Sequence, residues 1–259
     1  MDLGINGRKA IVCASSRGLG RACAEALAQA GCDVVINGRT TDVVEAAVAD
    51  IRQKTGATVT GVVADVADRA GQDALFAACP EPDILVNNNA GPPFRDFRVL
   101  TREQMLDGVI ANMVVAVELT QRAIDPMVRK RFGRVVNITS GTVKMPQAGL
   151  DLSSGARAGL TAFMAGVARA VAGSNVTINF LLPGAFDTDR LRASLEGNAK
   201  KQGVSYEDAA AQRIRTIPAG RFGIPAELGA TCAFLCSQQA SFITGQNILI
   251  DGGAFPGAF

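Results

Sequence analysis

Short apolar runs alternate with amphipathic segments along the whole chain. The runs predict strands over 9–13, 33–37, 58–63, 84–86, 134–138, 176–181 and 247–250. Between them apolar residues recur at helical spacing, as at Leu160, Met164 and Val167. Strands that are apolar throughout and separated by helices are typical of a parallel sheet covered on both faces. The pattern predicts one α/β domain over 1–259, with a seven-stranded, doubly wound parallel sheet and helices on both faces.

The first strand leads into a glycine-containing turn, Ala14–Gly20, and then into a helical pattern that ends at Gly31. Glycine lets the backbone approach a ligand closely, and the free N–H groups at a helix start attract phosphate. A strand, a turn of this kind and a helix are also found where no ligand binds. In a doubly wound sheet of the Rossmann type, however, a dinucleotide binds at this turn. The pattern therefore predicts a Rossmann-type fold with a dinucleotide site at Ala14–Gly20.

Residues at the end of the second predicted strand indicate which dinucleotide the chain would bind. In such folds an acidic residue about 20 positions past the glycine turn binds the ribose hydroxyls of NAD, and an arginine accommodates the 2′-phosphate of NADP. This chain has Asn37-Gly38-Arg39 there, and Arg17 lies within the turn. Two guanidinium groups favour NADP(H) over NAD(H). The alternative is that Arg39 is simply a solvated loop residue.

Composition narrows the function classes. The 259 residues are 48% hydrophobic and 19% charged, with a net charge of +2, so we expect a large core and neither nucleic acid nor a membrane as partner. Asp2 and Arg8 lie where a signal peptide has its apolar core. The cysteines fit no metal-ligand spacing, and we expect buried free thiols in a cytoplasmic protein without a metal at Cys13, Cys23, Cys32, Cys79, Cys232 and Cys236.

The chain has no histidine, and Tyr206 is its only tyrosine. Every mechanism that needs an imidazole is therefore excluded, including the Ser-His-Asp triad. Few side chains remain that could donate a proton.

Several ordered motifs resemble the short-chain dehydrogenase/reductase family over essentially the whole chain. They are Cys13–Gly20 with Ala14 in place of the first glycine, Asp65-Val66, Asn88-Asn89-Ala90-Gly91, Pro183–Asp189, Arg221–Pro225, Ile243–Gln246 and Asp251-Gly252-Gly253. The resemblance, nearest to β-ketoacyl carrier-protein reductases, implies strand order 3-2-1-4-5-6-7, a substrate lid at about 189–216 and a homotetramer or homodimer. It also implies cofactor contacts from Ala14, Ser15, Ser16, Arg17, Gly18, Leu19, Gly20, Arg39, Asp65, Val66, Asn89, Ala90, Gly91, Arg157, Pro183, Gly184, Phe186 and Thr188.

The family's catalytic pattern is a serine followed by Tyr-x-x-x-Lys, with an asparagine in the preceding long helix. By resemblance these positions are Ser140, Ser153, Arg157 and Asn112. The family tyrosine protonates the forming alkoxide, and the neighbouring lysine lowers its pKa. Ser153 is a far weaker acid and shorter than a phenol, whereas Arg157 keeps the positive charge but cannot release a proton.

Other groups could supply the proton: Lys144, Asp151, Tyr206, or Ser140 with an ordered water. Asp151 is alternatively a helix-capping residue, and Lys144 a solvated lysine. Arg131 resembles a carrier-protein docking position, but a second such position is Ser174, so a charge cluster at a helix end is the alternative. The interpretations are an NADP(H)-dependent reductase of a small carbonyl or acyl thioester, a regulatory or structural subunit that has lost hydride chemistry, and another reaction such as elimination or decarboxylation.

Overall fold

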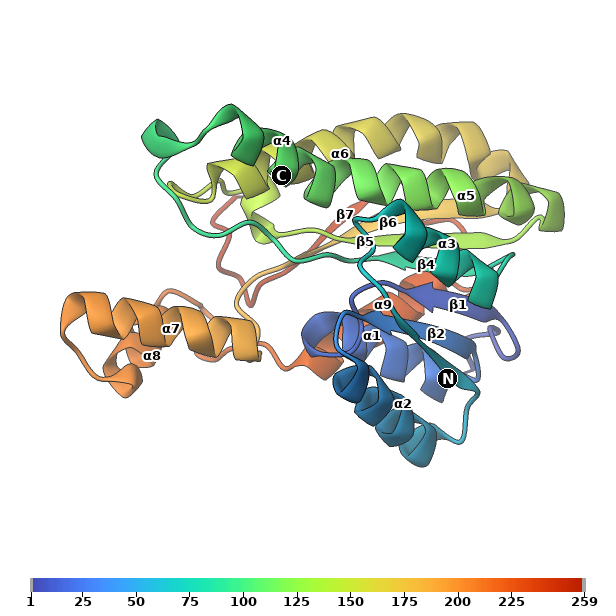
Figure 1. The fold of residues 1–259 in the computed structure, drawn as a ribbon, viewed down its shortest axis with the longest axis horizontal. Coiled ribbons are helices and arrows are strands. Elements are labelled where there is room, and N and C mark those ends of the chain that lie inside the picture. Colours follow the sequence, from blue (N-terminus) through green and yellow to red (C-terminus); the bar gives the residue numbers. More distant parts are fainter. Residues whose placement is uncertain (1, 258–259) are drawn as a thin grey trace.

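A computed structural model describes residues 2–257, which form one seven-stranded parallel sheet (Figure 1). The strands are β1 (Lys9–Val12), β2 (Asp33–Gly38), β3 (Val59–Val63), β4 (Ile84–Asn87), β5 (Gly133–Ile138), β6 (Val176–Pro183) and β7 (Asn247–Ile250). Their order is β3-β2-β1-β4-β5-β6-β7, and each neighbouring pair is parallel. The predicted fold class and strand order are both confirmed.

Helices cover both faces of this sheet. They are α1 (Gly18–Gln29), α2 (Thr41–Thr55), α3 (Arg69–Ala78), α4 (Arg102–Val109), α5 (Val115–Lys130), α6 (Asp151–Val171), α7 (Asp189–Gln202), α8 (Tyr206–Arg215) and α9 (Pro225–Cys236). Short 3₁₀ turns span Phe97–Val99, Gly141–Val143 and Ala172–Ser174. In Figure 1, α1, α2 and α9 lie on one face and α3, α5 and α6 on the other, while α7 and α8 project from the body of the sheet.

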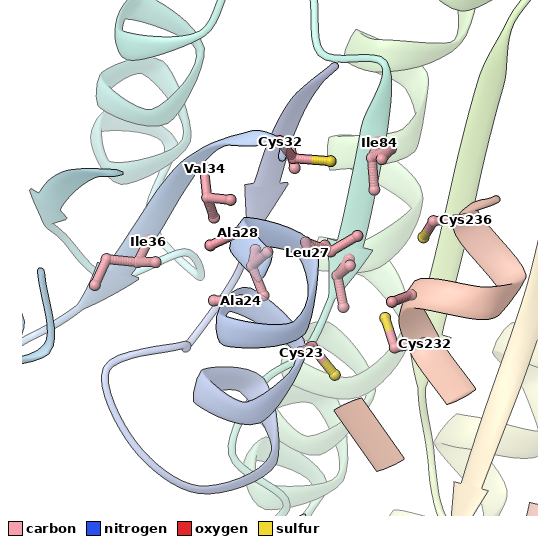
Figure 2. Packing of buried hydrophobic residues seen from close by; sticks show 14 of the residues in the cluster. Cys23, Ala24, Leu27, Ala28, Cys32, Val34, Ile36, Ile84, Cys232 and Cys236 are labelled. Atoms are coloured by element: carbon pink, nitrogen blue, oxygen red, sulfur yellow. The ribbon is translucent and has the colours of Figure 1, made fainter. Parts of the chain in front are cut away.

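The two faces correspond to two apolar cores. Because side chains alternate along a strand, Ala10 and Val12 of β1 point into the core beneath α1, α2 and α9, whereas Ile11 points into the core beneath α3, α5 and α6. Figure 2 shows the first core, where Leu27 of α1 packs among residues of β2, β4 and α9. Burial of these apolar side chains fixes the helices against the sheet.

The long helix that carries Asn112 is interrupted in the structure. Thr101 caps α4 through a reciprocal pair of hydrogen bonds with Gln104, but the helix widens into a π turn at Ile110–Val114 before continuing as α5. The periodicity of apolar residues did not reveal this turn, because the segments on both sides of it are helical and show helical spacing. Turns of this kind occur frequently at functional sites.

The strand order reverses between β1 and β4, which lie side by side in the sheet. Ligands of open α/β sheets bind in the crevice outside the carboxyl ends of the strands at such a point. The β1–α1 turn, the segment after β4 and the ends of β5 and β6 all open into this crevice. The fold therefore brings together the segments on which the predicted site depends.

All six cysteines are free and buried, as predicted. Between residues 2 and 257 no group of three or more His, Cys, Asp or Glu side chains is arranged to hold a metal ion. Over the same range, no helix has the length and apolar character needed to cross a membrane.

Candidate active site

The β1–α1 turn is held in place by an asparagine from the neighbouring strand. Asn37, which is 1% exposed, accepts a hydrogen bond from Ala14 N at 2.9 Å and donates to Ala64 O at 2.7 Å. Its backbone oxygen accepts from the N–H groups of Ser15 and Ser16, and Asn37 N donates to Ser15 Oγ at 3.0 Å. The turn is thus rigid before any ligand is present.

The conformation of the turn explains its small residues. Ala14 has a φ of +44°, a left-handed conformation that glycine adopts without strain. A Cβ on Gly20 would lie 2.5 Å from Ala14 O and 2.8 Å from Asn88 Nδ2, so only glycine lets α1 start this close to β1. Asn88 Nδ2 donates to Ala14 O at 3.2 Å and holds the turn from its other side.

The charged residues predicted to select the cofactor lie at this end of the crevice. Arg17 is exposed and precedes the first residue of α1, and it forms no ion pair within the described part of the chain. Arg39 lies 3.6 Å from Asp65 and is itself 73% exposed. A loosely paired guanidinium of this kind can turn to meet a phosphate, because exposed ion pairs are weak. Val66, beside Asp65, is buried.

Ser140 ends the segment after β5 and lies next to the end of β6. Its Oγ accepts hydrogen bonds from Thr142 N at 3.2 Å and Thr142 Oγ1 at 3.0 Å. A Cβ on Gly141 would lie 3.4 Å from Pro183 O. With two hydrogen bonds accepted, the Ser140 hydroxyl still has its own proton to donate.

Ser153 and Arg157 form the pair that the helical spacing predicts. Both lie in the first two turns of α6, and Arg157 Nη1 donates to Ser153 Oγ at 2.5 Å. Burial, and after it the positive charge of Arg190, lowers the pKa of Arg157 to about 10. The group remains a cation at neutral pH, because this value is still well above 7.

Gly91, after β4, lies against this pair. A Cβ there would be 3.1 Å from Arg157 Nη1 and 3.0 Å from Arg190 Nη2. Arg190, in the first turn of α7, donates to Gly91 O at 3.3 Å. Sequence reasoning missed Arg190, although its position directly after Thr188-Asp189 in the lid motif was a usable signal.

The π turn positions Asn112 and its neighbours. Asn112 Nδ2 donates to Gly108 O and Asn89 Nδ2 donates to Ala111 O, both at 3.1 Å. Asn112 Oδ1 and Asn87 Oδ1 are buried without a hydrogen-bond partner. Both asparagines line a cavity of about 20 Å³, which Arg157 also lines. This space is enough for one water molecule, and the two oxygens can accept its hydrogen bonds.

The segment between β6 and α7 lies over the crevice. A Cβ on Gly184 would be 2.7 Å from Asp251 Cβ, so the chain passes closely there. Phe186 is buried, and its backbone forms an isolated parallel β-bridge with Gly223. Thr188 Oγ1 accepts from Leu191 N and caps α7. The structure thus brings the end of the Pro183–Asp189 motif, followed by Arg190, to the same crevice as Gly91 and Arg157.

The structure also places the other residues that were considered as proton donors. Lys144 Nζ lies 5.8 Å from the ring centre of Phe255. Tyr206 begins α8, one helix beyond the crevice. Asp151 accepts from Gly149 N at 2.8 Å and lies in the first turn of α6, where a carboxylate favours the helix N-terminus as predicted, although it does not occupy the cap position itself. The cap position is Leu150, which has no side chain suited to capping.

The basic run at the end of α5 is largely paired. Arg129 lies 3.1 Å from Glu81 and Lys130 lies 2.8 Å from Asp83. Arg131 ends the helix with a φ of +50° and donates to Gly173 O at 3.3 Å. These contacts favour the helix-end charge cluster over a docking site for an acidic partner.

Sequence reasoning also missed two residues that hold the turn through hydrogen bonds to Ala14. They are Asn37 of β2 and Asn88, which follows β4. Each is a polar residue at the end of an apolar strand that the fold buries or half-buries. A buried amide must have its hydrogen bonds satisfied, so a polar residue in this place is a signal of a structured turn.

Known proteins are similar to this chain over most of its length. Residues 13–254 match a family model described as Enoyl-(Acyl carrier protein) reductase. The NADPH-dependent reductase BacG of Bacillus subtilis is 33% identical over 252 residues, covering 95% of this chain and 97% of BacG. The 3-oxoacyl-[acyl-carrier-protein] reductase FabG of Aquifex aeolicus is 34% identical over 262 residues, covering 98% and 100%.

Two solved structures extend the likeness. YwfH, an NADPH-dependent reductase involved in bacilysin biosynthesis, superposes with a TM-score of 0.92 at 32% identity, covering 97% of this chain and 100% of YwfH. L-sorbose reductase from Gluconobacter frateurii, solved with NADPH and L-sorbose, has a TM-score of 0.94 at 27% identity, covering 99% and 100%.

Proposed function

Because this chain belongs to the short-chain dehydrogenase/reductase family, we propose that it is an NADP(H)-dependent oxidoreductase with an atypical active site, acting on a carbonyl or 3-oxoacyl-type substrate. The observation that carries the proposal is the hydrogen-bonded Ser153–Arg157 pair. It lies beside Gly91 and next to the cavity of Asn112, at the position where the family resemblance places the reaction.

The residues present fit the cofactor that the relatives use. The braced turn leaves the first N–H groups of α1 without helical partners, and such groups bind phosphate. Arg17 has no ion-pair partner among residues 2–257, and Arg39 is only loosely paired, so both can meet a 2′-phosphate. The rest of the cofactor would be held by Ala14–Gly20, Asp65, Val66, Asn89–Gly91 and the 183–188 segment. The bound cofactor supplies or accepts the hydride.

The chain's own residues divide the remaining work. Ser140 donates a hydrogen bond from its hydroxyl to a carbonyl oxygen and so orients and polarises the substrate. Arg157 stabilises negative charge that develops on this oxygen, because it is a fixed cation in a partly dry site. Ser153 accepts from Arg157 and keeps the guanidinium in place. A water held by Asn112 and Asn87 is the proton source in this scheme, since Tyr206 lies on α8.

The alternative is a protein that binds NADP(H) but serves as a regulatory or structural subunit. It is favoured by the lack of a tyrosine at Ser153, because losing a matched general acid typically lowers a rate by about 10²–10⁴-fold. Either form would assemble as a homodimer or homotetramer through the long helices around Asn112 and Leu160. Exposed apolar side chains there are Met105 and Leu106 of α4, Ile110 of the π turn and Phe163 of α6. The six free thiols fit a cytoplasmic location.

The test is NADPH oxidation with a 3-oxoacyl thioester, comparing the natural protein with the double variant Ser153→Tyr/Arg157→Lys. Binding of NADPH to both proteins is confirmed first by fluorescence titration. Arg169→Lys, an exposed change farther along α6, is the matched control. Turnover by the natural protein, with little gain in the variant, supports a working serine–arginine site. Turnover by the variant alone, about 10²-fold or more above the natural protein, contradicts the proposal and favours the subunit alternative.

A further inference from the structure

The ring of Phe94 packs on the loop that leads into α6. A Cβ on Gly149 would lie 2.1 Å from Phe94 Cζ, so the ring rests directly against this residue. Gly149 has a φ of +82°, a conformation that favours glycine. The next residue fixes the same contact, because Arg95 N donates to Gly149 O at 2.9 Å. Phe94 is thus held on one side, although it is 67% exposed.

Two short connections place Phe94 beside the serine–arginine pair. Phe94 follows Gly91 by three residues, so their Cα atoms lie at most about 11 Å apart, and Gly91 lies against Arg157. In the other direction, Gly149 N donates to Asp151 Oδ2 at 2.8 Å, and Asp151 is the first residue of α6, the helix that carries the pair. The ring therefore lies at the border of the crevice, beyond the cofactor segment that ends at Gly91.

The loop between Ser140 and α6 has few groups that could bind a polar substrate. Residues 141–150 include one charged side chain, Lys144, whose Nζ lies 5.8 Å from the ring centre of Phe255. The hydroxyl of Thr142 already donates to Ser140 Oγ at 3.0 Å. The apolar residues of this loop other than glycine are Val143, Met145, Pro146, Ala148 and Leu150. Polar groups that lose water without new partners bind poorly, so the loop suits an apolar chain better than a polyol.

Phe94 belongs to a group of exposed apolar side chains at this border. Phe94, Phe97 and Val99 are 67%, 67% and 64% exposed. Single exposed apolar side chains are ordinary, but several together mark a binding surface. The exposed residues of the proposed subunit contact lie on α4, the π turn and α6, whereas Phe94 precedes all of these elements and packs on the loop of the crevice.

We propose that Phe94 is a specificity-determining residue that binds an apolar chain of the substrate. The substrate class is then carbonyl compounds with an acyl or alkyl chain, rather than polyhydroxy ketones. This inference rests on the proposed function. The carbonyl group lies at the hydrogen-bonded Ser153–Arg157 pair, and the chain extends outward between Phe94 and the 141–150 loop. Phe94 touches no reacting atom, so it stabilises the bound substrate and the transition state equally.

The experiment measures how binding and turnover depend on chain length. 3-Oxobutanoyl, 3-oxohexanoyl and 3-oxooctanoyl thioesters of N-acetylcysteamine are compared with the polyhydroxy ketone L-sorbose as substrates of NADPH oxidation. Butanoyl and octanoyl thioesters, which lack the 3-oxo group, are titrated by calorimetry into the protein saturated with NADPH, a readout that needs no turnover.

The variants are Phe94→Ser, the conservative Phe94→Leu and the control Phe242→Ser. Phe242 is fully exposed and precedes the amino end of β7, whereas the crevice lies at the carboxyl ends of the strands. Light scattering of each variant reports its oligomeric state.

We expect the octanoyl thioester to bind about 10- to 100-fold more tightly than the butanoyl thioester, because each buried methylene strengthens binding by up to about 4-fold. Phe94→Ser lowers this ratio by about 5-fold or more, while Phe94→Leu and Phe242→Ser largely keep it. With the 3-oxoacyl substrates, Phe94→Ser raises KM for the long chain and leaves kcat unchanged, as expected for a contact that binds substrate and transition state equally.

Binding that does not depend on chain length overturns the inference, as does faster turnover of L-sorbose than of every thioester. It is also overturned if Phe94→Ser changes the oligomeric state and leaves the ratio unchanged, because Phe94 is then a subunit contact. If no compound is reduced but the octanoyl thioester still binds more tightly in a way that depends on Phe94, only the proposed reduction fails.

Discussion

The two ends of the crevice are built on opposite principles. At the β1–α1 turn, Asn37, Ser15 and Asn88 pair the backbone groups of the turn with one another. At the other end, among the described residues, Arg157 near the start of α6 has no ion-pair partner, and Asn112 Oδ1 in the π turn has no hydrogen-bond partner. The polar groups of the turn are thus paired within the protein, whereas two polar groups near the proposed reaction site are not. Under the proposed function, cofactor binding would depend on a rigid backbone, and the reaction on side chains that a substrate and water complete.

The substitution with the largest expected effect on the β1–α1 turn is Gly20→Val. Its Cβ would collide with Ala14 O, and overpacking of this kind typically destabilises a protein by about 1–3 kcal/mol. We expect the NADPH dissociation constant to rise by about 10-fold or more, because a shift of α1 moves the N–H groups that bind phosphate. Fluorescence titration and urea unfolding measure the two effects.

Gly166→Ala is the matched control for that variant. Nothing lies within 4 Å of its Cβ position in α6, so we expect a gain of about 0.5–1 kcal/mol from the higher helix propensity of alanine and unchanged NADPH binding. Normal NADPH affinity in Gly20→Val would show that the turn does not bind the cofactor.

At the unsatisfied end, we expect Arg157→Met to stabilise the free protein by about 1–2 kcal/mol, because it removes a buried charge without a partner. Activity should be lost in the same variant. Urea unfolding of the cofactor-free protein and NADPH oxidation measure the two changes. A less stable variant would show that Arg157 is already well satisfied in the free protein.

The pH dependence of this stabilisation provides a second check. Burial lowers the folded-state pKa of Arg157 to about 10, so the unfolded chain binds more protons above that pH and stability rises with pH there. The advantage of Arg157→Met is therefore fully present below pH 10 and shrinks above it. An advantage that stays constant across this range would contradict the burial explanation.

The smallest expected effect is that of Ala14→Gly. Ala14 has a φ of +44°, where glycine is unstrained, but glycine also makes the unfolded chain more flexible. The net gain should be about 0.5 kcal/mol, with NADPH affinity unchanged. Urea unfolding of both proteins tests it, and a loss of stability would mean that Asn37 and Asn88 hold Ala14 in this conformation without strain.

The sequence by itself determined the fold class and the glycine turn. Apolar periodicity and residue spacing carry this information because they are local, and the i,i+4 spacing of Ser153 and Arg157 likewise fixed their contact within one helix. The strand order was predicted only from the resemblance to a known family, because no local pattern records it. The π turn at Ile110–Val114 was not predicted, because the segments on both sides of it are helical and show helical spacing.

Only the tertiary structure decided which distant residues meet. Asn37 and Asn88 reach Ala14 because β2 and β4 both lie beside β1. Arg190 reaches Gly91 and Arg157 because the chain after β6 crosses the carboxyl ends of the strands. Such contacts depend on strand order and crossover geometry, and no spacing along the chain records them. The charge at the reacting end is therefore a property of the fold rather than of any single motif.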